Sequence, residues 1–236
     1  MAFQPPPASR RQVAGVPFNN AVSFAPEAKR RYDEFDRKAR NRDPSKCKAL
    51  LAFPGNGTKI RAVFWSAKMS IDADGPAAGP GRKRGRELDA TGQNVTTFRF
   101  SNRKSLPAEA VPYIVLPQNE AEDGPFDPNI AIGDVAIVIF KDMITAAICG
   151  DLGPVKKIGE ASIRVHEALQ PACPDPCRRD QNGFCSKVRN SSVDEDVLYF
   201  VFPGSNFADG ELTLDNITTK LKERAFALYN QLRGAS

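Results

Sequence analysis

Two acidic residues in a glycine-rich stretch have the types and spacing for acid–base chemistry. Asp151 follows the apolar run at 144–149, and Glu160 opens the next apolar run nine residues later. Gly150 and Gly159 precede them and let the backbone turn sharply where a strand ends. The pattern predicts both carboxylates at the facing ends of consecutive strands. Such a pair suits hydrolysis of a glycosidic bond, in which one group protonates the leaving oxygen and the other activates water.

The same residues also admit a structural interpretation, in which Asp151 caps a turn and Glu160 faces solvent. Other chemistries lack their motifs, because the sequence has no glycine-rich phosphate loop, zinc-protease signature or Gly-x-Ser-x-Gly. His166 is the single histidine, so a Ser-His-Asp or Cys-His system must use it. It ends a strand pattern far from any nucleophile motif and is predicted to be a packing or surface residue. No metal or cofactor is predicted.

The cysteines favour a disulfide over a metal site. Three of the five fall within thirteen residues, at Cys173, Cys177 and Cys185. Their spacing, even with His166 added, matches no common zinc pattern. A disulfide that pins this proline-rich loop is the preferred interpretation, and a zinc site is the alternative. The odd number leaves a free thiol, and Cys149 is the candidate because a buried cysteine acts as a small hydrophobe.

Short apolar runs separated by turn residues predict a mainly β fold. Two of these runs are joined through Lys141-Asp142-Met143, which indicates a tight hairpin. With almost no helix between them, the runs predict a closed barrel of six to seven strands. The predicted strands are 60–71, 95–100, 112–116, 135–140, 144–149, 158–165 and 197–202.

Helices are predicted only near the two ends of the chain, packed outside the barrel. Residues 1–25 are proline-rich, and helical spacing of apolar residues runs from Pro26 to Asp43. The predicted divisions are a tail with a helix at 1–59, the catalytic barrel at 60–205 and a helical segment at 206–236.

The C-terminal helix is predicted from both its caps and its apolar face. Thr213 or Asp215 can cap its start, and Gly234 ends it. The spacing of its apolar residues places them on one side, where they would seal the barrel. This face is Ile217, Leu221, Ala225, Leu228 and Leu232.

The segments around the two acids also match a known pattern. They read Ile148-Cys-Gly-Asp151-Leu-Gly-Pro and Gly159-Glu160-Ala-Ser-Ile. Together they resemble the paired active-site segment of the fungal-type chitosanases, glycoside hydrolase family 75. The resemblance implies that Asp151 and Glu160 are the essential carboxylates, and it runs from about residue 60 to 205. The Gly-Asp-x-Gly turn also resembles double-psi β-barrel hydrolases, so a double-psi-like barrel is predicted.

Three further segments agree with the same family. Lys68 to Gly75 resembles its Asp-x-Asp-Gly segment, and 194–199 resembles the acidic segment before its last strand. Val111-Pro-Tyr-Ile-Val resembles its His-Pro-Tyr-Val-Val strand, with Val111 in place of the histidine. We therefore expect substrate to be bound by Asp72, Asp74, Tyr113, Asp194, Glu195 and Asp196.

The resemblance implies an endo-acting chitosanase that hydrolyses β-1,4 glucosamine linkages with inversion, without a cofactor and as a monomer. Chitosan is cationic below about neutral pH, so its groove should be acidic. The chain has a formal net charge of +5, with basic residues gathered at 29–48 and 82–86. We expect these clusters to face away from an acidic cleft. They lack interleaved stacking aromatics, so no nucleic-acid partner is predicted.

The sequence gives no sign of a membrane partner. No apolar run approaches the length of a bilayer span. The first residues lack the basic and apolar segments of a signal peptide, although the family is mostly secreted. This departure is consistent with a bacterial or virus-encoded member released by cell lysis, or with a chain whose signal has been removed.

Two other functions remain open. The first is another polysaccharide-cleaving enzyme on the same barrel, such as a peptidoglycan lytic transglycosylase, which can work with one carboxylate. The second is a carbohydrate-binding module without catalysis. Such a module binds through exposed aromatic residues, but the single tryptophan, Trp65, lies in an apolar strand pattern.

Overall fold

A computed structural model describes residues 15–16, 22–23, 49–55, 60–119, 121–155, 157–189 and 192–234. The predicted helix from Pro26 to Asp43, the basic stretch at 29–48 and Cys47 lie outside these residues. Two strands precede the barrel, β1 (Val22–Ser23) and β2 (Ala49–Pro54). Within the described residues, no helix has the length and apolar character that a membrane span requires.

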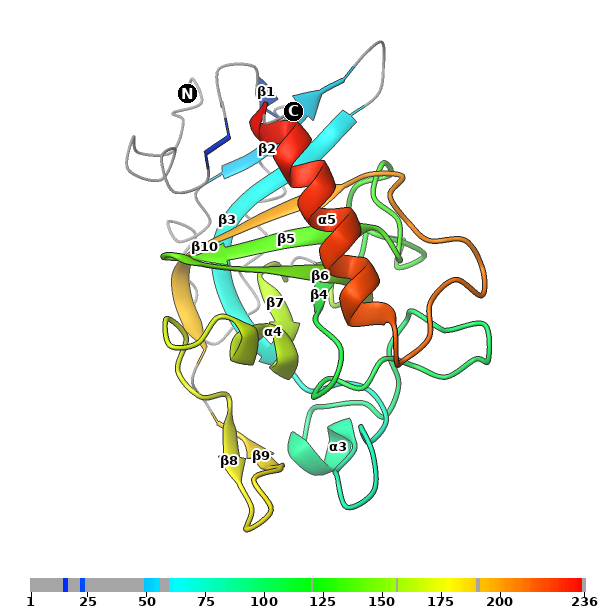
Figure 1. The fold of residues 1–236 in the computed structure, drawn as a ribbon, viewed down its shortest axis with the longest axis vertical. Helices are drawn as coiled ribbons and strands as arrows, with labels where there is room; N and C mark the ends of the chain where they lie inside the picture. The colour runs from blue at the N-terminus through cyan, green and yellow to red at the C-terminus, as the bar shows by residue number, and fades with distance from the viewer. Residues whose placement is uncertain are drawn as a thin grey trace.

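Six strands close into a barrel, as the sequence predicts (Figure 1). Their order is β3, β10, β5, β6, β4 and β7, and β7 pairs back with β3. The β4–β6 and β3–β7 pairs are parallel, and the others are antiparallel. The strands are β3 (Ile60–Asp72), β4 (Tyr113–Pro117), β5 (Val135–Phe140), β6 (Met143–Gly153), β7 (Glu160–Ser162) and β10 (Val193–Phe202).

Alternate residues along the strands belong to two separate apolar clusters. Phe200 of β10 contacts Tyr229 of the C-terminal helix, with ring centroids 5.5 Å apart. The cluster that contains Phe200 therefore faces outward, toward that helix. The adjacent Tyr199 stacks on Trp65 at 5.3 Å and belongs to the other cluster, which fills the barrel. A closed barrel requires this alternation. Trp65 is only 1% exposed, so it is a core residue and not a sugar-binding platform.

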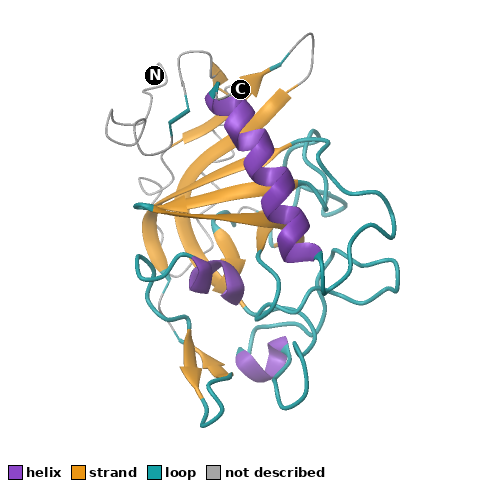
Figure 2. Ribbon diagram, in the orientation of Figure 1, coloured by secondary structure: helices purple, strands orange, loops and turns teal. Residues whose placement is uncertain are grey.

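The C-terminal helix α5 (Ile217–Arg233) packs outside the barrel against β5 and β6 (Figure 2). Four of the five residues predicted for its apolar face are buried. The exception is Leu228, which is only partly buried, while Tyr229 is buried because its ring reaches Phe200. The helix ends at Gly234, which has a left-handed φ of 75°, as the sequence predicts.

The start of α5 differs from the prediction. Asn216, rather than Thr213 or Asp215, occupies the N-cap position. Its side-chain oxygen accepts a hydrogen bond from the Thr213 amide at 2.8 Å, which closes the turn before the helix. The helix therefore begins one residue later than a cap at Asp215 would allow.

Two predicted strands are wrong in whole or in part. Residues 95–100 form a loop with one isolated bridge, Arg99 to Ser105. The predicted strand 158–165 is β-structure only over Glu160–Ser162 and continues as helix α4 (Ile163–Ala168). Ser162 caps this helix by accepting a hydrogen bond from the Val165 amide at 3.3 Å. A short apolar run fits a strand or a buried helix equally well, so periodicity could not separate them.

Helix α4 carries His166, which is a packing residue. It is fully buried, with Nε2 3.3 Å from the Ser70 carbonyl oxygen. Burial lowers its pKa to about 4, so it is neutral in the folded protein.

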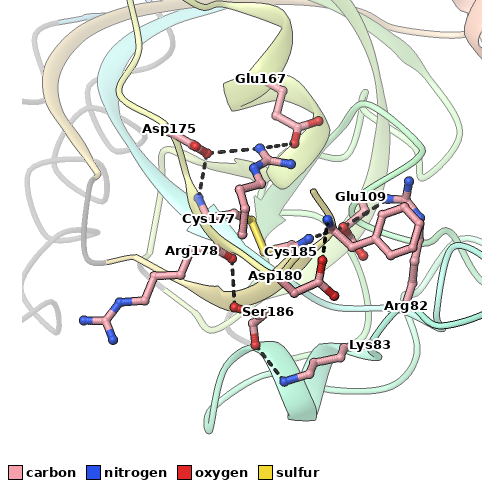
Figure 3. Close-up of a disulfide and its surroundings, with 12 residues drawn as sticks. Arg82, Lys83, Glu109, Glu167, Asp175, Cys177, Arg178, Asp180, Cys185 and Ser186 are labelled. Atoms are coloured by element: carbon pink, nitrogen blue, oxygen red, sulfur yellow. Dashed lines mark hydrogen bonds and ion pairs between the residues drawn. A yellow bond between two sulfur atoms is a disulfide. The ribbon is translucent and has the colours of Figure 1, made fainter. Parts of the chain in front are cut away.

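The cysteine-rich loop forms a small disulfide-bonded hairpin beside the barrel (Figure 3). Its strands are β8 (Cys177–Arg179) and β9 (Cys185–Val188), bridged by Cys177–Cys185. This confirms the disulfide interpretation and excludes zinc ligation by these two residues. Cys149 and Cys173 are free and buried.

The basic loop at 82–86 packs against this hairpin instead of standing free. It contains one helical turn, α3 (Gly85–Leu88). Arg82 pairs with Glu109 at 3.1 Å and stacks on Phe184, and Lys83 donates to the Ser186 carbonyl at 2.9 Å.

Candidate active site

Asp151 and Glu160 stand on opposite sides of a single strand. Val115 of β4 pairs with Asp151 on one side and with Glu160 on the other. Directly paired residues point to the same face of a sheet, so both carboxylates leave the barrel wall on one face. The two strands are consecutive in the chain, as predicted, but they do not pair, because β4 comes earlier in the chain and inserts between β6 and β7. Two strand spacings separate the backbones by about 10 Å.

Gly150 determines the face on which Asp151 lies. The β4–β6 register slips by one residue between Ile114 and Val115, which leaves Gly150 as the extra residue of a bulge. A Cβ on Gly150 would lie 2.6 Å from the Cβ of Tyr113, so only glycine fits. A one-residue slip reverses the faces of all following side chains. Without the bulge, Asp151 would point into the barrel. Asp151 thus lies within strand β6 and not in a turn after it.

Thr97 holds the Asp151 carboxylate in place. Its amide and hydroxyl donate to Asp151 Oδ1 at 2.9 and 2.6 Å, and the Leu152 amide donates to the same oxygen at 2.8 Å. Asp151 is 6% exposed, and this burial raises its pKa above the usual value. The hydrogen bonds from Thr97 and Leu152, together with the charge of Arg99, oppose that rise. The carboxylate is therefore oriented through one oxygen.

Glu160 is fixed by its neighbours on both sides. Lys157 Nζ lies 2.7 Å from Glu160 Oε1, and the glutamate side chain is 12% exposed. Gly159 has a φ of 82°, and a Cβ there would lie 2.3 Å from the Lys68 carbonyl oxygen. The Gly159 carbonyl accepts a hydrogen bond from the Ser70 amide at 2.9 Å. This close approach of β7 to β3 brings Glu160 into register with Ser70.

Asp72 and Asp74 join the pair in a cluster of four carboxyl groups. Oxygens of Asp72, Asp74 and Asp151 lie within 4.8 Å of one another. Burial first, and then the charge of Glu160, raises the pKa of Asp72 well above its usual value. Burial, with the charges of Asp151 and Glu160, raises the pKa of Asp74 to about 6. The cluster therefore holds protons at mildly acidic pH.

The backbone around Asp72 and Asp74 is tied to the barrel and to the next loop. The Asp74 amide donates to Asp72 Oδ1 at 2.8 Å, and the Gln93 amide donates to Asp74 Oδ1 at 2.6 Å. The Tyr113 hydroxyl donates to the Asp74 carbonyl at 2.8 Å. Tyr113 is fully buried, so in this structure its side chain leaves no surface for a substrate to contact.

Among the described side chains, Asp194 and Asp196 are not part of the group of carboxylates that lie within 4.8 Å of one another. Asp194 and Asp196 lie where β10 begins, with Val193 paired to Met69 of β3. Strand β3 lies between β10 and β7, so the segment is on the other side of β3 from Glu160. Asp72 and Asp74, by contrast, follow directly from the end of β3 into the site.

An open cleft of about 860 Å³ lies between loops whose neighbouring residues Gln93 and Thr97 hydrogen-bond to Asp74 and Asp151. Its walls are the loop after Asp74, the loop that carries Thr97, and the turn before α5. No local pattern selects Thr97 as a site residue, because its stretch resembles a strand and its partner Asp151 is 54 residues away in the chain. Lys157, by contrast, is close to Glu160 in the sequence, as a basic residue of the loop between Asp151 and Glu160.

The cluster also has the donors that a divalent cation prefers, since three carboxylate oxygens approach one another closely. Crowded carboxylates are equally explained by shared protons, as the raised pKa values of Asp72 and Asp74 indicate. Activity measurements on this site therefore need a chelator control.

Carboxyl groups held in place on neighbouring strands are the groups that acid–base hydrolysis uses. Residues 69–229 match the family described as fungal chitosanase of glycosyl hydrolase group 75. The match spans more than half of the chain, which belongs to this family and is a chitosanase-type glycoside hydrolase with a polysaccharide substrate. The match extends through most of α5, whereas the resemblance found in the motifs ends at about residue 205. Comparison with curated proteins gives no match.

Proposed function

We propose that this protein is an endo-acting chitosanase that hydrolyses β-1,4 linkages between glucosamine units with inversion at the anomeric carbon. Glu160 acts as the general acid and Asp151 as the general base. The observation that carries the proposal is the interposed strand β4, which pairs with both residues through Val115. An inverting enzyme needs its carboxyls roughly 6.5–9.5 Å apart to admit a water molecule. Backbones two strands apart, at about 10 Å, are compatible with this separation of the carboxyl groups.

Glu160 gives its proton to the glycosidic oxygen while Asp151 takes a proton from the attacking water, and the water oxygen bonds to the anomeric carbon from the opposite side. Exchange with solvent then restores both groups. The three donors on Asp151 Oδ1 support its assignment as the base, because they favour a fixed carboxylate.

Asp72 and Asp74 are proposed to bind the cationic substrate and to set the charge of the site. A glucosamine ammonium placed beside four carboxyl groups is attracted electrostatically. We also propose more distant substrate contacts in the acidic segment, at Asp194, Glu195 and Asp196. The natural polymer is too large to enter a cell, so we propose that the enzyme acts outside one, as a monomer.

The direct experiment is incubation of the purified protein with chitosan, chitin and peptidoglycan, followed by sizing of the products. The proposal predicts rapid shortening of chitosan into oligosaccharides, with and without chelator. Release of anhydro-sugar products from peptidoglycan would instead identify a lytic transglycosylase. Binding without any shortening would identify a non-catalytic carbohydrate-binding protein.

A further inference from the structure

The hairpin of β8 and β9 carries two like charges directly opposite each other. Arg178 is paired in register with Lys187, and both side chains are exposed. The Arg178 side chain extends away from the disulfide and from the acidic residues around it (Figure 3). Like charges that face each other across a strand pair destabilise the pairing. The hairpin therefore holds an unfavourable pair that its own fold does not explain.

A third cation completes a pocket at the same place. The pocket has a volume of about 310 Å³ and is lined by Arg178, Lys187, Val188 and Arg189. Arg189 is exposed, like the other two cations. In the part of the chain that the structure describes, none of the three forms an ion pair. Every charged group that lines this pocket is therefore positive.

The acidic residues of this region serve other partners. Asp175 and Glu167 both pair with Arg179, at 3.0 and 2.7 Å. Burial raises the pKa of Asp175, the hydrogen bond from Arg179 lowers it most, and the charge of Arg189 lowers it least. Asp180 accepts hydrogen bonds from two amides of the hairpin turn, at 2.9 and 3.0 Å. These carboxylates hold the hairpin together and leave the pocket with its positive charge.

The backbone beneath the pocket is held in place from several sides. The disulfide between Cys177 and Cys185 joins the two strands, and the Cys185 amide donates to the buried Glu109 at 3.1 Å. Lys83 Nζ donates to the Ser186 carbonyl at 2.9 Å, which places a fourth exposed cation beside β9. Charges on a pre-organised backbone bind an anion with a smaller loss of conformational freedom.

The spacing of the cations indicates which anion fits. Side chains directly opposite each other on a strand pair begin about 5 Å apart, so closely spaced negative charges match them best. Successive groups of a linear phosphate chain are joined through a single oxygen, whereas a sugar separates the charges of an acidic polysaccharide or a nucleic acid. Arginine also binds phosphate oxygens through paired hydrogen bonds. Cationic chitosan is repelled here, because like charges disfavour each other.

We propose that the β8–β9 hairpin is a binding surface for a linear polyphosphate chain. Successive phosphates contact Arg178, Lys187 and Arg189, and Lys83 extends the surface along β9. A chain fits better than one phosphate, because four cations exceed the one to two negative charges that a single phosphate carries. Protonated chitosan itself attracts polyanions, so this surface holds the enzyme where such a substrate gathers. The inference goes beyond the proposed function, since the hairpin supplies no member of the acid cluster.

Calorimetric titration of the full chain with inorganic polyphosphate tests this surface. Arg178→Gln combined with Lys187→Gln should weaken binding about three- to tenfold, as expected for two exposed charges, and should reduce its salt dependence. The matched control, Arg61→Gln with Lys222→Gln, removes two exposed cations at the start of β3 and on α5, away from the hairpin (Figure 1), and should bind like the wild type. An absence of wild-type binding, or equal weakening in both double variants, would overturn the proposal.

The folded state and the catalytic activity of the hairpin variant are checked alongside. Its Tm should be no lower than that of the wild type, because a like-charge pair has been removed. Its cleavage of free chitosan should equal that of the wild type, so a failure of this inference leaves the proposed function standing. A loss of cleavage in a variant that melts normally would assign the hairpin to the active site instead and contradict the proposal.

Two other ligands separate a polyphosphate chain from its alternatives. Inorganic phosphate and single-stranded DNA, each at an equal concentration of phosphate groups, should both bind more weakly than polyphosphate. Free phosphate that binds as tightly as the chain would reduce the surface to a site for a single anion. DNA that binds as tightly or more tightly would identify a nucleic-acid ligand. Either result would contradict the proposal.

Discussion

Asp151 and Glu160 are in register with each other, because both pair with Val115 of β4 from the strands on its two sides. Their separation is therefore built from hydrogen-bonded strand spacings. Loop movements at the surface cannot bring them together without breaking the β4 ladder. Such a wall holds two reacting groups at a fixed distance, as acid–base catalysis requires.

The first prediction concerns the two carboxylates. Asp151→Asn and Glu160→Gln should each lower turnover of chitosan at least about a hundredfold, because each removes an acid–base group from the transition state. Circular dichroism and thermal melting should remain close to wild type. Near-normal turnover by either variant, measured from reducing ends, would show that the assigned mechanism is wrong.

The second prediction concerns Thr97 and pH. Its hydroxyl lowers the pKa of Asp151 against the effect of burial, so Thr97→Val should raise that pKa. Because the base must be ionised, the acidic limb of kcat/KM against pH should move to higher pH. Thr97→Ser keeps the hydroxyl and should restore the wild-type profile. A profile that does not move in the valine variant contradicts Asp151 as the base.

The third prediction concerns the bulge at Gly150. A Cβ there meets the Tyr113 side chain at 2.6 Å, so Gly150→Ala should shift Asp151 and lower activity by more than about tenfold. It should also lower the free energy of unfolding by about 1–3 kcal/mol through overpacking. Gly124→Ala is the matched control, since a Cβ there meets only the Asn119 side-chain nitrogen, at an ordinary contact distance of 3.6 Å. Equal effects of the two changes in denaturant melts and assays would remove the argument for the bulge.

The fourth prediction links Asp72 to stability. Its pKa is raised in the folded protein, so the folded state holds a proton that the unfolded chain has lost. Stability should therefore fall as the pH rises above about 4, the usual value of an unfolded aspartate. Asp72→Asn needs no proton, so its Tm should fall less steeply over the same range. A Tm profile as steep as that of the wild type would place the titrating group elsewhere.

The sequence predicted features that depend on local pattern. The β5–β6 hairpin pairs Phe140 with Met143 as the turn at Lys141-Asp142 indicated, and α5 follows its apolar spacing to Gly234. The four-carboxyl cluster was partly foreseen, because Asp72 and Asp74 stand in a recognisable segment. These signals are contained within a few residues of each other.

What the sequence could not predict depends on pairing between distant segments. Nothing near β6 or β7 indicates that β4 will insert between them, since that pairing is made across about 40 residues of chain. Thr97 reaches Asp151 from a loop 54 residues earlier. The apolar run that begins at Ile158 is part strand and part helix, because Ser162 caps helix α4. The apolar residues around Ser162 give no sign of this cap in the sequence.

The stereochemistry of the first product tests the central claim most directly. Proton NMR of the new reducing end, recorded within minutes of mixing enzyme and chitosan, distinguishes the α from the β anomer. Carboxylates two strands apart leave room for water between base and sugar, so the β-linked substrate should give α product first. The β anomer appearing first would mean retention, and Asp151 could then not be a water-activating base.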